Sequence, residues 1–205
     1  TGTGNSIYAF RTSSDVSGGT LRVTAIDNVR SGGVLINGSN TISTNLIFDP
    51  TSATAPGTGI PSEGLVYVKT GENATISGNV TSNAFTKFGA GTLTLSGAGN
   101  MVAGDLSIQD GTLRVGSSTA LSRLNTELNV NSGATLDLNG QNVAFETIGS
   151  NNRQVAGATV GGSVTNTSGT ASTLMVAGPV NSVFNGTLNL NLKLSKAGTG
   201  TLTIN

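Results

Sequence analysis

A short repeated motif, Gly-Thr-Leu-x-apolar, constrains the fold of this chain more than any other feature of its sequence. Each copy joins a turn-forming glycine to a short strand in which apolar and polar residues alternate. Repetition of such a unit predicts stacked structural repeats instead of one compact core. Five copies begin at Gly19, Gly91, Gly111, Gly186 and Gly200, and a sixth, with one inserted residue, begins at Gly133.

The spacing between copies indicates how the repeats stack. Leu93, Leu113 and Leu136 follow one another at nearly equal intervals. Further strand-like segments lie between them at 105–108 and 127–130, bounded by turn signals. Two or three short strands per turn of roughly 20–23 residues predict an all-β fold, a parallel β-helix (β-solenoid), and the chirality of parallel crossovers makes it right-handed. An antiparallel sandwich also fits short strands, but the period and the scarcity of aromatic residues favour the solenoid.

The same alternation predicts which side chains form the core. We expect the apolar residues of three motif copies to point inward and to stack between successive turns: Leu93, Leu95, Leu113, Val115, Leu136 and Leu138. We expect Phe85 and Phe88 to pack at a corner of the coil.

The chain is expected to form one continuous elongated domain. Residues 1–84 match the motif loosely and predict irregular turns, with a proline-containing loop near 49–62, because proline cannot donate to a strand ladder. Residues 85–205 predict a regular solenoid, with a second surface excursion at 150–156.

Composition excludes several functional classes. Only 10% of residues are charged, and ten Lys plus Arg balance ten Asp plus Glu. This balance gives no basic surface for nucleic acid and no polybasic patch for a membrane. The longest apolar run is too short to insert into a bilayer. Disorder is disfavoured because 36% of residues are hydrophobic and they recur in alternating clusters.

The sequence predicts no catalytic, cofactor-binding or metal-binding residues and therefore no enzyme. Histidine and cysteine are absent, which removes the commonest bases, nucleophiles and metal ligands. We interpret Asp105 and Asp110 as residues of a turn. Asp137 is expected on the solvated outward face of its strand, where stacking could bring it beside Asp110 or Glu127, and we favour a solvated face over a catalytic pair. The remaining carboxylates are expected on solvated surfaces: Asp15, Asp27, Asp49, Glu63, Glu72 and Glu146.

The motif extends into longer blocks, at Lys87–Gly97, Gly111–Gly116 and Gly133–Gly140, and residues 195–205 look like the opening of another copy. These blocks resemble the autotransporter-associated β-strand repeat. One departure is that Met101-Val102-Ala103-Gly104 replaces the family's Tyr-x-Gly turn. The resemblance implies a secreted passenger segment of a Gram-negative autotransporter, displayed outside the cell as a right-handed β-helix.

The resemblance leaves the biological role open among three hypotheses. The first is a cell-surface scaffold for adhesion, aggregation or biofilm formation, with a host or neighbouring-cell surface as partner. The second is an extracellular filament or matrix subunit that stacks end to end. The third, disfavoured by the lack of clustered carboxylates, is a polysaccharide-active β-helix enzyme. Because residues 201–205 are strand-like, we also expect the last turn to meet more of the same polypeptide or a second copy.

Overall fold

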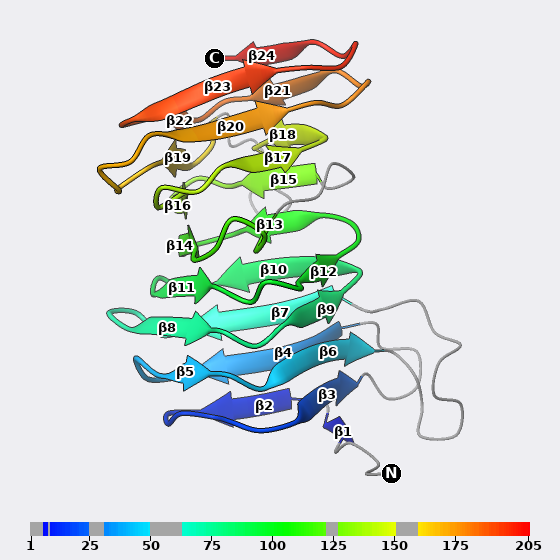
Figure 1. Cartoon of the computed structure of the whole chain (residues 1–205), viewed down its shortest axis with the longest axis vertical. Helices are drawn as coiled ribbons and strands as arrows, with labels where there is room; N and C mark the ends of the chain where they lie inside the picture. The colour runs from blue at the N-terminus through cyan, green and yellow to red at the C-terminus, as the bar shows by residue number, and fades with distance from the viewer. Residues whose placement is uncertain (1–5, 8, 25–30, 50–62, 122–126, 151–159) are drawn as a thin grey trace.

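The computed structural model describes residues 6–7, 9–24, 31–49, 63–121, 127–150 and 160–205. These residues form strands and turns, with no helix among them. The strands stack in parallel as a β-solenoid of about seven turns, which runs from β1 at one end to β24 at the other (Figure 1). The predicted fold class, a parallel β-solenoid, is confirmed.

Three sheets form most of the coil, and every strand pair in them is parallel. Sheet A contains β1 (Ser6–Ile7), β3 (Thr20–Thr24), β6 (Asn45–Asp49), β9 (Val80–Ser82) and β12 (Met101–Val102). Sheet B contains β2 (Ala9–Thr12), β4 (Ser31–Ile36), β7 (Glu63–Val68), β10 (Ala84–Phe88), β13 (Leu106–Ile108), β15 (Glu127–Val130) and β18 (Thr147–Gly149). Sheet C contains β5 (Thr41–Ile42), β8 (Asn73–Ile76), β11 (Thr92–Leu95), β14 (Gly111–Val115), β16 (Ala134–Asp137), β19 (Ser163–Thr165) and β22 (Thr187–Leu188).

Two smaller parallel sheets complete the C-terminal turns. Sheet D contains β17 (Val143–Phe145), β20 (Ser172–Val176) and β23 (Leu192–Lys196). Sheet E contains β21 (Ser182–Phe184) and β24 (Leu202–Ile204). Sheet B therefore ends at β18, and the strand that follows in the stack, β21, begins a separate sheet.

Strand register gives the length of each turn directly. In the segment with the clearest motif, Leu93 pairs with Leu113 and Leu113 with Leu136, which confirms the turn length expected there. Other turns also have the expected length, as where Ser182 pairs with Leu202, but two are longer, because Thr41 pairs with Thr75 and Leu136 with Val164. The loops predicted near 49–62 and 150–156 fall within these longer turns and lie almost entirely outside the described residues.

The core is a narrow column of aliphatic side chains inside the coil. All six residues predicted to point inward have no exposed surface, and the repeated leucines stack directly from turn to turn. The phenylalanines contribute more than the sequence suggested, because Phe48, Phe85, Phe145 and Phe184 are also buried. Phe88 instead lies at the end of β10 on the outer face, where its ring is 5.4 Å from that of Tyr67.

Short polar side chains link successive turns at the corners of the coil. The backbone N–H of Asn79 donates to Asn45 Oδ1, and the N–H of Gly99 donates to Asn79 Oδ1, each at 2.8 Å. One asparagine per turn thus satisfies a backbone group of the next, which explains the abundance of this residue at turns.

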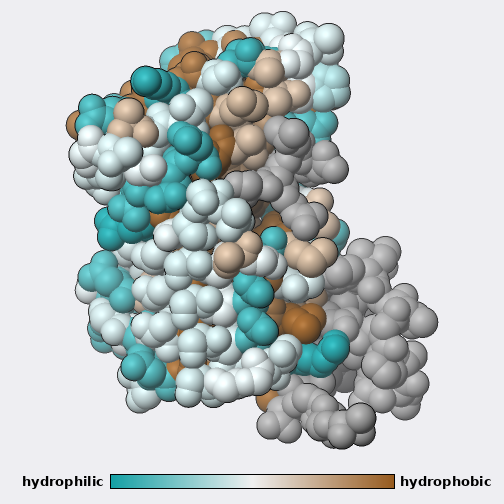
Figure 2. Space-filling view, viewed as in Figure 1, coloured by the Kyte–Doolittle hydropathy of each residue, from teal (hydrophilic) through white to brown (hydrophobic). Residues whose placement is uncertain are grey.

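The face shown in Figure 2 carries mostly residues of intermediate hydropathy, with strongly hydrophilic ones in small groups.

Candidate functional site: the repeat turn and the groove beside it

The most regular turns of the solenoid are built from one motif block stacked on the next. Leu93 and Leu95 of β11 pair with Leu113 and Val115 of β14, and all four side chains are fully buried. Their alternation with outward-facing threonines and arginine gives sheet C one apolar and one polar face. This in-register stack is the element that the sequence repeat encodes.

Lys87, the first residue of the motif block, is buried in the coil, although lysine is almost never buried without partners. Its Nζ donates to the carbonyl oxygens of Gly89 and Gly91, each at 2.5 Å, and to the carbonyl of Asp110 at 2.7 Å. Two of these carbonyls belong to the turn that follows β10, and the third belongs to the next level of the stack. The ammonium group therefore binds two successive turns together.

The glycines of the motif make room for this lysine. Gly89 and Gly111 adopt positive φ angles of 77° and 65°, a conformation that side chains with a Cβ rarely adopt. A Cβ on Gly111 would lie only 2.5 Å from Lys87 Nζ. The Lys-x-Gly-x-Gly spacing thus combines a buried cation with the tight turn whose carbonyls hold it.

Burial lowers the pKa of Lys87 to about 8, since the charged form loses its hydration; the nearby Asp110 carboxylate acts in the opposite direction. Lys196 occupies the equivalent position in a later motif copy. Its Nζ donates to the carbonyls of Ala197 and Gly198, and the side chain is exposed. Lys87 thus reaches carbonyls two and four positions further along the chain and one in the next turn, whereas Lys196 reaches those one and two positions further along.

Asp137 corrects one sequence prediction. It is expected to be solvated on the outer face, but it is 1% exposed, and its register partners in the sheet are Arg114 and Thr165 instead of Asp110 or Glu127. Its carboxylate accepts from Arg114 Nε at 2.9 Å, from the backbone N–H and hydroxyl of Thr167 at 3.0 and 2.7 Å, and from the N–H of Asn139 at 3.0 Å.

These contacts span three levels of the stack and determine the charge state of Asp137. Burial alone raises the pKa of Asp137, but the donors from Thr167, Arg114 and Asn139 outweigh it and hold the pKa below its ordinary value. Asp137 is therefore an ionised cross-link between turns.

Other carboxylates of the described residues accept structural hydrogen bonds from backbone N–H groups or from a hydroxyl group. Asp15 accepts from the N–H of Thr41, Asp110 from the N–H of Gly111, and Glu63 from the hydroxyl of Thr86. No group of three or more potential His, Cys, Asp or Glu metal ligands gathers within the part of the chain that the structure describes. Within that same part, no helix is long and apolar enough to cross a membrane.

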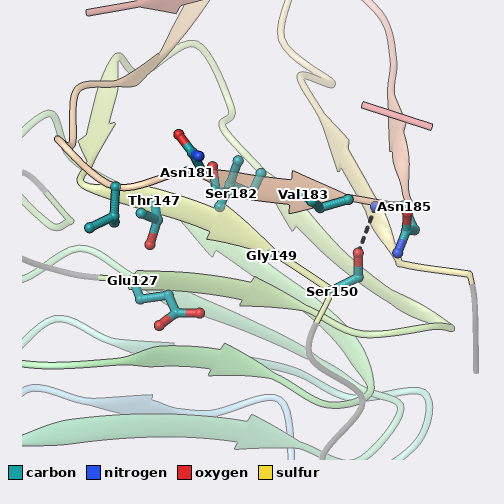
Figure 3. Close-up of a pocket in the computed structure, with 10 residues that line it drawn as sticks. Glu127, Thr147, Gly149, Ser150, Asn181, Ser182, Val183 and Asn185 are labelled. Carbon is teal, nitrogen blue, oxygen red and sulfur yellow. Dashed lines mark hydrogen bonds between the residues drawn. The ribbon is translucent and has the colours of Figure 1, made fainter. Parts of the chain in front are cut away.

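A groove of about 360 Å³ lies between β18, the last strand of sheet B, and β21, which belongs to sheet E. The backbone hydrogen bonding of sheet B does not continue across this gap. Figure 3 shows Ser182 and Val183 on one side, Thr147 and Gly149 on the other, and Glu127 of β15 below them. Ser150 Oγ accepts a hydrogen bond from the backbone N–H of Asn185 at 2.8 Å and closes one end. Sequence reasoning missed this groove because its residues come from three separate turns and carry no common motif.

A family model for the passenger-associated-transport-repeat matches residues 85–115 of the chain. The match covers β10 to β14, the segment that holds the Lys87 turn and the stacked leucines. It confirms the resemblance to autotransporter passenger repeats, a class of secreted or cell-surface proteins. No curated protein and no solved structure matches the chain significantly.

Proposed function

We propose that this chain is a segment of a surface-displayed passenger that serves as a rigid scaffold in adhesion or cell–cell aggregation. The observation that carries the proposal is the passenger-associated repeat at 85–115, which coincides with the most regular turns of the solenoid. A stack of short turns is suited to this role because each added turn extends the rod without changing its cross-section.

Two physical properties suit the chain to a scaffold role. Stability comes from turn-to-turn contacts, such as the Lys87 ammonium and the Asp137 cross-link, and needs no disulfide, since the chain has no cysteine. The low charge of the surface lets similar threonine and asparagine side chains lie above one another without like-charge repulsion. Both properties favour a long, uniform scaffold.

Display and adhesion can be tested together on bacterial cells. The chain is fused to an outer-membrane translocator, and intact cells are examined by antibody labelling and by settling or binding to immobilised cells. We expect surface labelling and faster settling than for cells that carry the translocator alone. Surface labelling without any gain in settling or binding would contradict the adhesive role, and a protein held inside the cell would contradict display.

We also propose that the described residues carry out no polysaccharide cleavage. The support is the use of Asp137 as a buried cross-link and of Asp110 and Asp15 as turn acceptors, none of which leaves a free pair of carboxylates. Incubation of the purified chain with common polysaccharides should release no reducing ends. Release that disappears in an Asp137→Asn variant would overturn this proposal.

A further inference from the structure

Two buried oxygen atoms beside the β18–β21 groove find no hydrogen-bond partner among the described residues. They are Ser182 Oγ, from a residue that lines the groove, and Asn129 Oδ1, from β15 beneath it. A buried polar atom without a partner costs about 1–3 kcal/mol, so such atoms are rare in native proteins. Seven such side-chain atoms occur among the described residues, five of them elsewhere, so the two at the groove support a binding site only together with its open volume and its lining.

The residue at position 149 keeps this part of the groove open. Gly149 pairs with Asn129 in the sheet, and a Cβ built on it would lie 3.1 Å from Asn129 Oδ1 and 3.6 Å from Glu127 Oε1. Any larger residue would therefore project into the space beside both acceptors. The glycine is not required by a positive φ angle here, so the open space is the physical consequence of its small size.

The lining of the groove combines side chains that can both donate and accept hydrogen bonds with exposed aliphatic side chains. Hydroxyl groups come from Thr147, Ser150 and Ser182, and amides come from Asn181 and Asn185. Val180 and Val183 on the same groove are 54% and 48% exposed. A volume of about 360 Å³ falls at the lower end of the range for small-molecule sites, which is about 300–1,000 Å³.

We propose that this groove binds one or two rings of a neutral saccharide. Sugar hydroxyls both donate and accept, so they satisfy the carboxylate of Glu127, the amides and the hydroxyl groups together. The apolar C–H faces of the ring pack against Val180 and Val183. Glu127 is the one ionisable side chain among the described lining residues, so its charge favours neutral rings and disfavours acidic ones.

This inference names a ligand for the adhesive role proposed above and rests on that role only for its biological setting. Binding is measured on the purified chain, whereas display is measured on cells, so failure of one is distinguishable from failure of the other. If the purified chain binds a saccharide but the displayed chain causes no adhesion of cells, the groove assignment stands and the adhesive role fails.

The test uses the purified chain and the methyl glycosides of glucose, galactose, mannose and glucuronic acid, with n-butylamine as a probe for a simple cation site. Binding is followed by saturation-transfer NMR and isothermal titration. Gly149→Val fills the space beside the acceptors, and Ser182→Ala removes an unpartnered oxygen without adding bulk. Ser43→Ala is the matched control for Ser182→Ala, because it removes one hydroxyl group at a remote exposed position, where Ser43 Oγ donates to the carbonyl of Val16.

We expect at least one neutral glycoside to bind the native chain and the Ser43→Ala control equally. Binding should weaken by about tenfold in Ser182→Ala, the cost of one hydrogen bond, and should be lost in Gly149→Val. If Gly149→Val unfolds, the Ser182→Ala result decides. The proposal is overturned if no neutral glycoside binds, if the glucuronide binds as well as the glucoside, if n-butylamine alone binds, or if both groove variants bind like the native chain.

Discussion

At the scale of single residues, Lys87 is the side chain on which the repeat turn depends most. Its ammonium satisfies three carbonyl groups from two levels of the stack, so truncation leaves a cavity and three acceptors without their donor. We expect Lys87→Ala to lower the free energy of unfolding by about 2–4 kcal/mol. Lys196→Ala, the same change at an exposed motif lysine, is expected to cost less than about 1 kcal/mol.

Denaturant titration followed by circular dichroism measures both values. Equal losses in the two variants would contradict the role given to burial and to the carbonyl of Asp110. A smaller loss at Lys87 than at Lys196 would contradict it more strongly.

Lys87 also predicts a pH dependence with a definite sign. Its folded-state pKa of about 8 lies below the ordinary value of 10.5, so the folded chain binds this proton more weakly than the unfolded chain. Below pH 8 the folded state carries the full desolvation cost. The free energy of unfolding therefore rises between pH 8 and 10.5, by on the order of 3 kcal/mol.

The measurement compares denaturation at pH 7 and pH 10 in the native chain and in Lys87→Met, which removes the titrating group and keeps a similar shape. The native chain should gain stability relative to the variant as pH rises. A constant difference between the two proteins at both pH values would show that Lys87 does not titrate in this range.

Asp137 illustrates why single residues were harder to predict than the fold. Alternation along 134–138 places Leu136 and Leu138 inward and Asp137 outward, and this inference follows correctly from the strand period. What covers the outer face is set by Thr167, which lies in the next turn of the coil, and the sequence does not reveal the length of that turn. The sequence pattern therefore predicted the direction of the side chain and missed its burial.

At the scale of strands, the stacked leucines are the elements that hold successive turns in register. Leu113 is fully buried between Leu93 and Leu136. Replacement by aspartate places an unpaired charge in a narrow core, so we expect Leu113→Asp to destabilise the chain by more than about 4 kcal/mol. Thr112→Asp is the matched control, because Thr112 is the neighbouring half-buried position on the outer face.

Thermal melts of the two variants check this expectation. The control should melt within a few degrees of the native chain, and Leu113→Asp should lose cooperative unfolding. Equal melting of the two variants would mean that Leu113 does not lie in the core.

Strands were predicted well where the motif repeats and poorly where it does not. The register of β11, β14 and β16 follows from the regular spacing of their leucines. The pairing of Thr41 with Thr75 closes a much longer turn, and no spacing in the sequence predicts it. The β18–β21 groove was equally invisible, because it arises from an interruption of hydrogen bonding between turns and not from a residue pattern.

At the scale of the whole molecule, function follows from repetition. The turns draw on a small set of devices: a stack of aliphatic side chains, glycine turns, asparagine bridges and, in the matched repeat, a buried lysine. Stability in such a stack is a sum of contacts between neighbouring turns, so the rod can vary in length and carry local interruptions. The groove at β18–β21 is one such interruption within an otherwise continuous scaffold.

The parallel, in-register stacking of the passenger-type repeat is the central claim, and engineered disulfides test it most directly. The chain has no cysteine of its own, so any disulfide that forms must join the two introduced cysteines. Thr92 and Thr112 are register partners on the outer face of sheet C. Partners in a parallel sheet lie about 4.8 Å apart, within disulfide range, whereas an offset of two positions along the strand places them about 8 Å apart, beyond it.

The account predicts that Thr92→Cys/Thr112→Cys oxidises readily to an intramolecular disulfide under mild oxidant. The offset pair Thr94→Cys/Thr112→Cys should remain reduced under the same conditions, as shown by thiol titration and mass spectrometry. Preferential oxidation of the offset pair, or equal oxidation of both, would contradict the stacked register on which the scaffold depends.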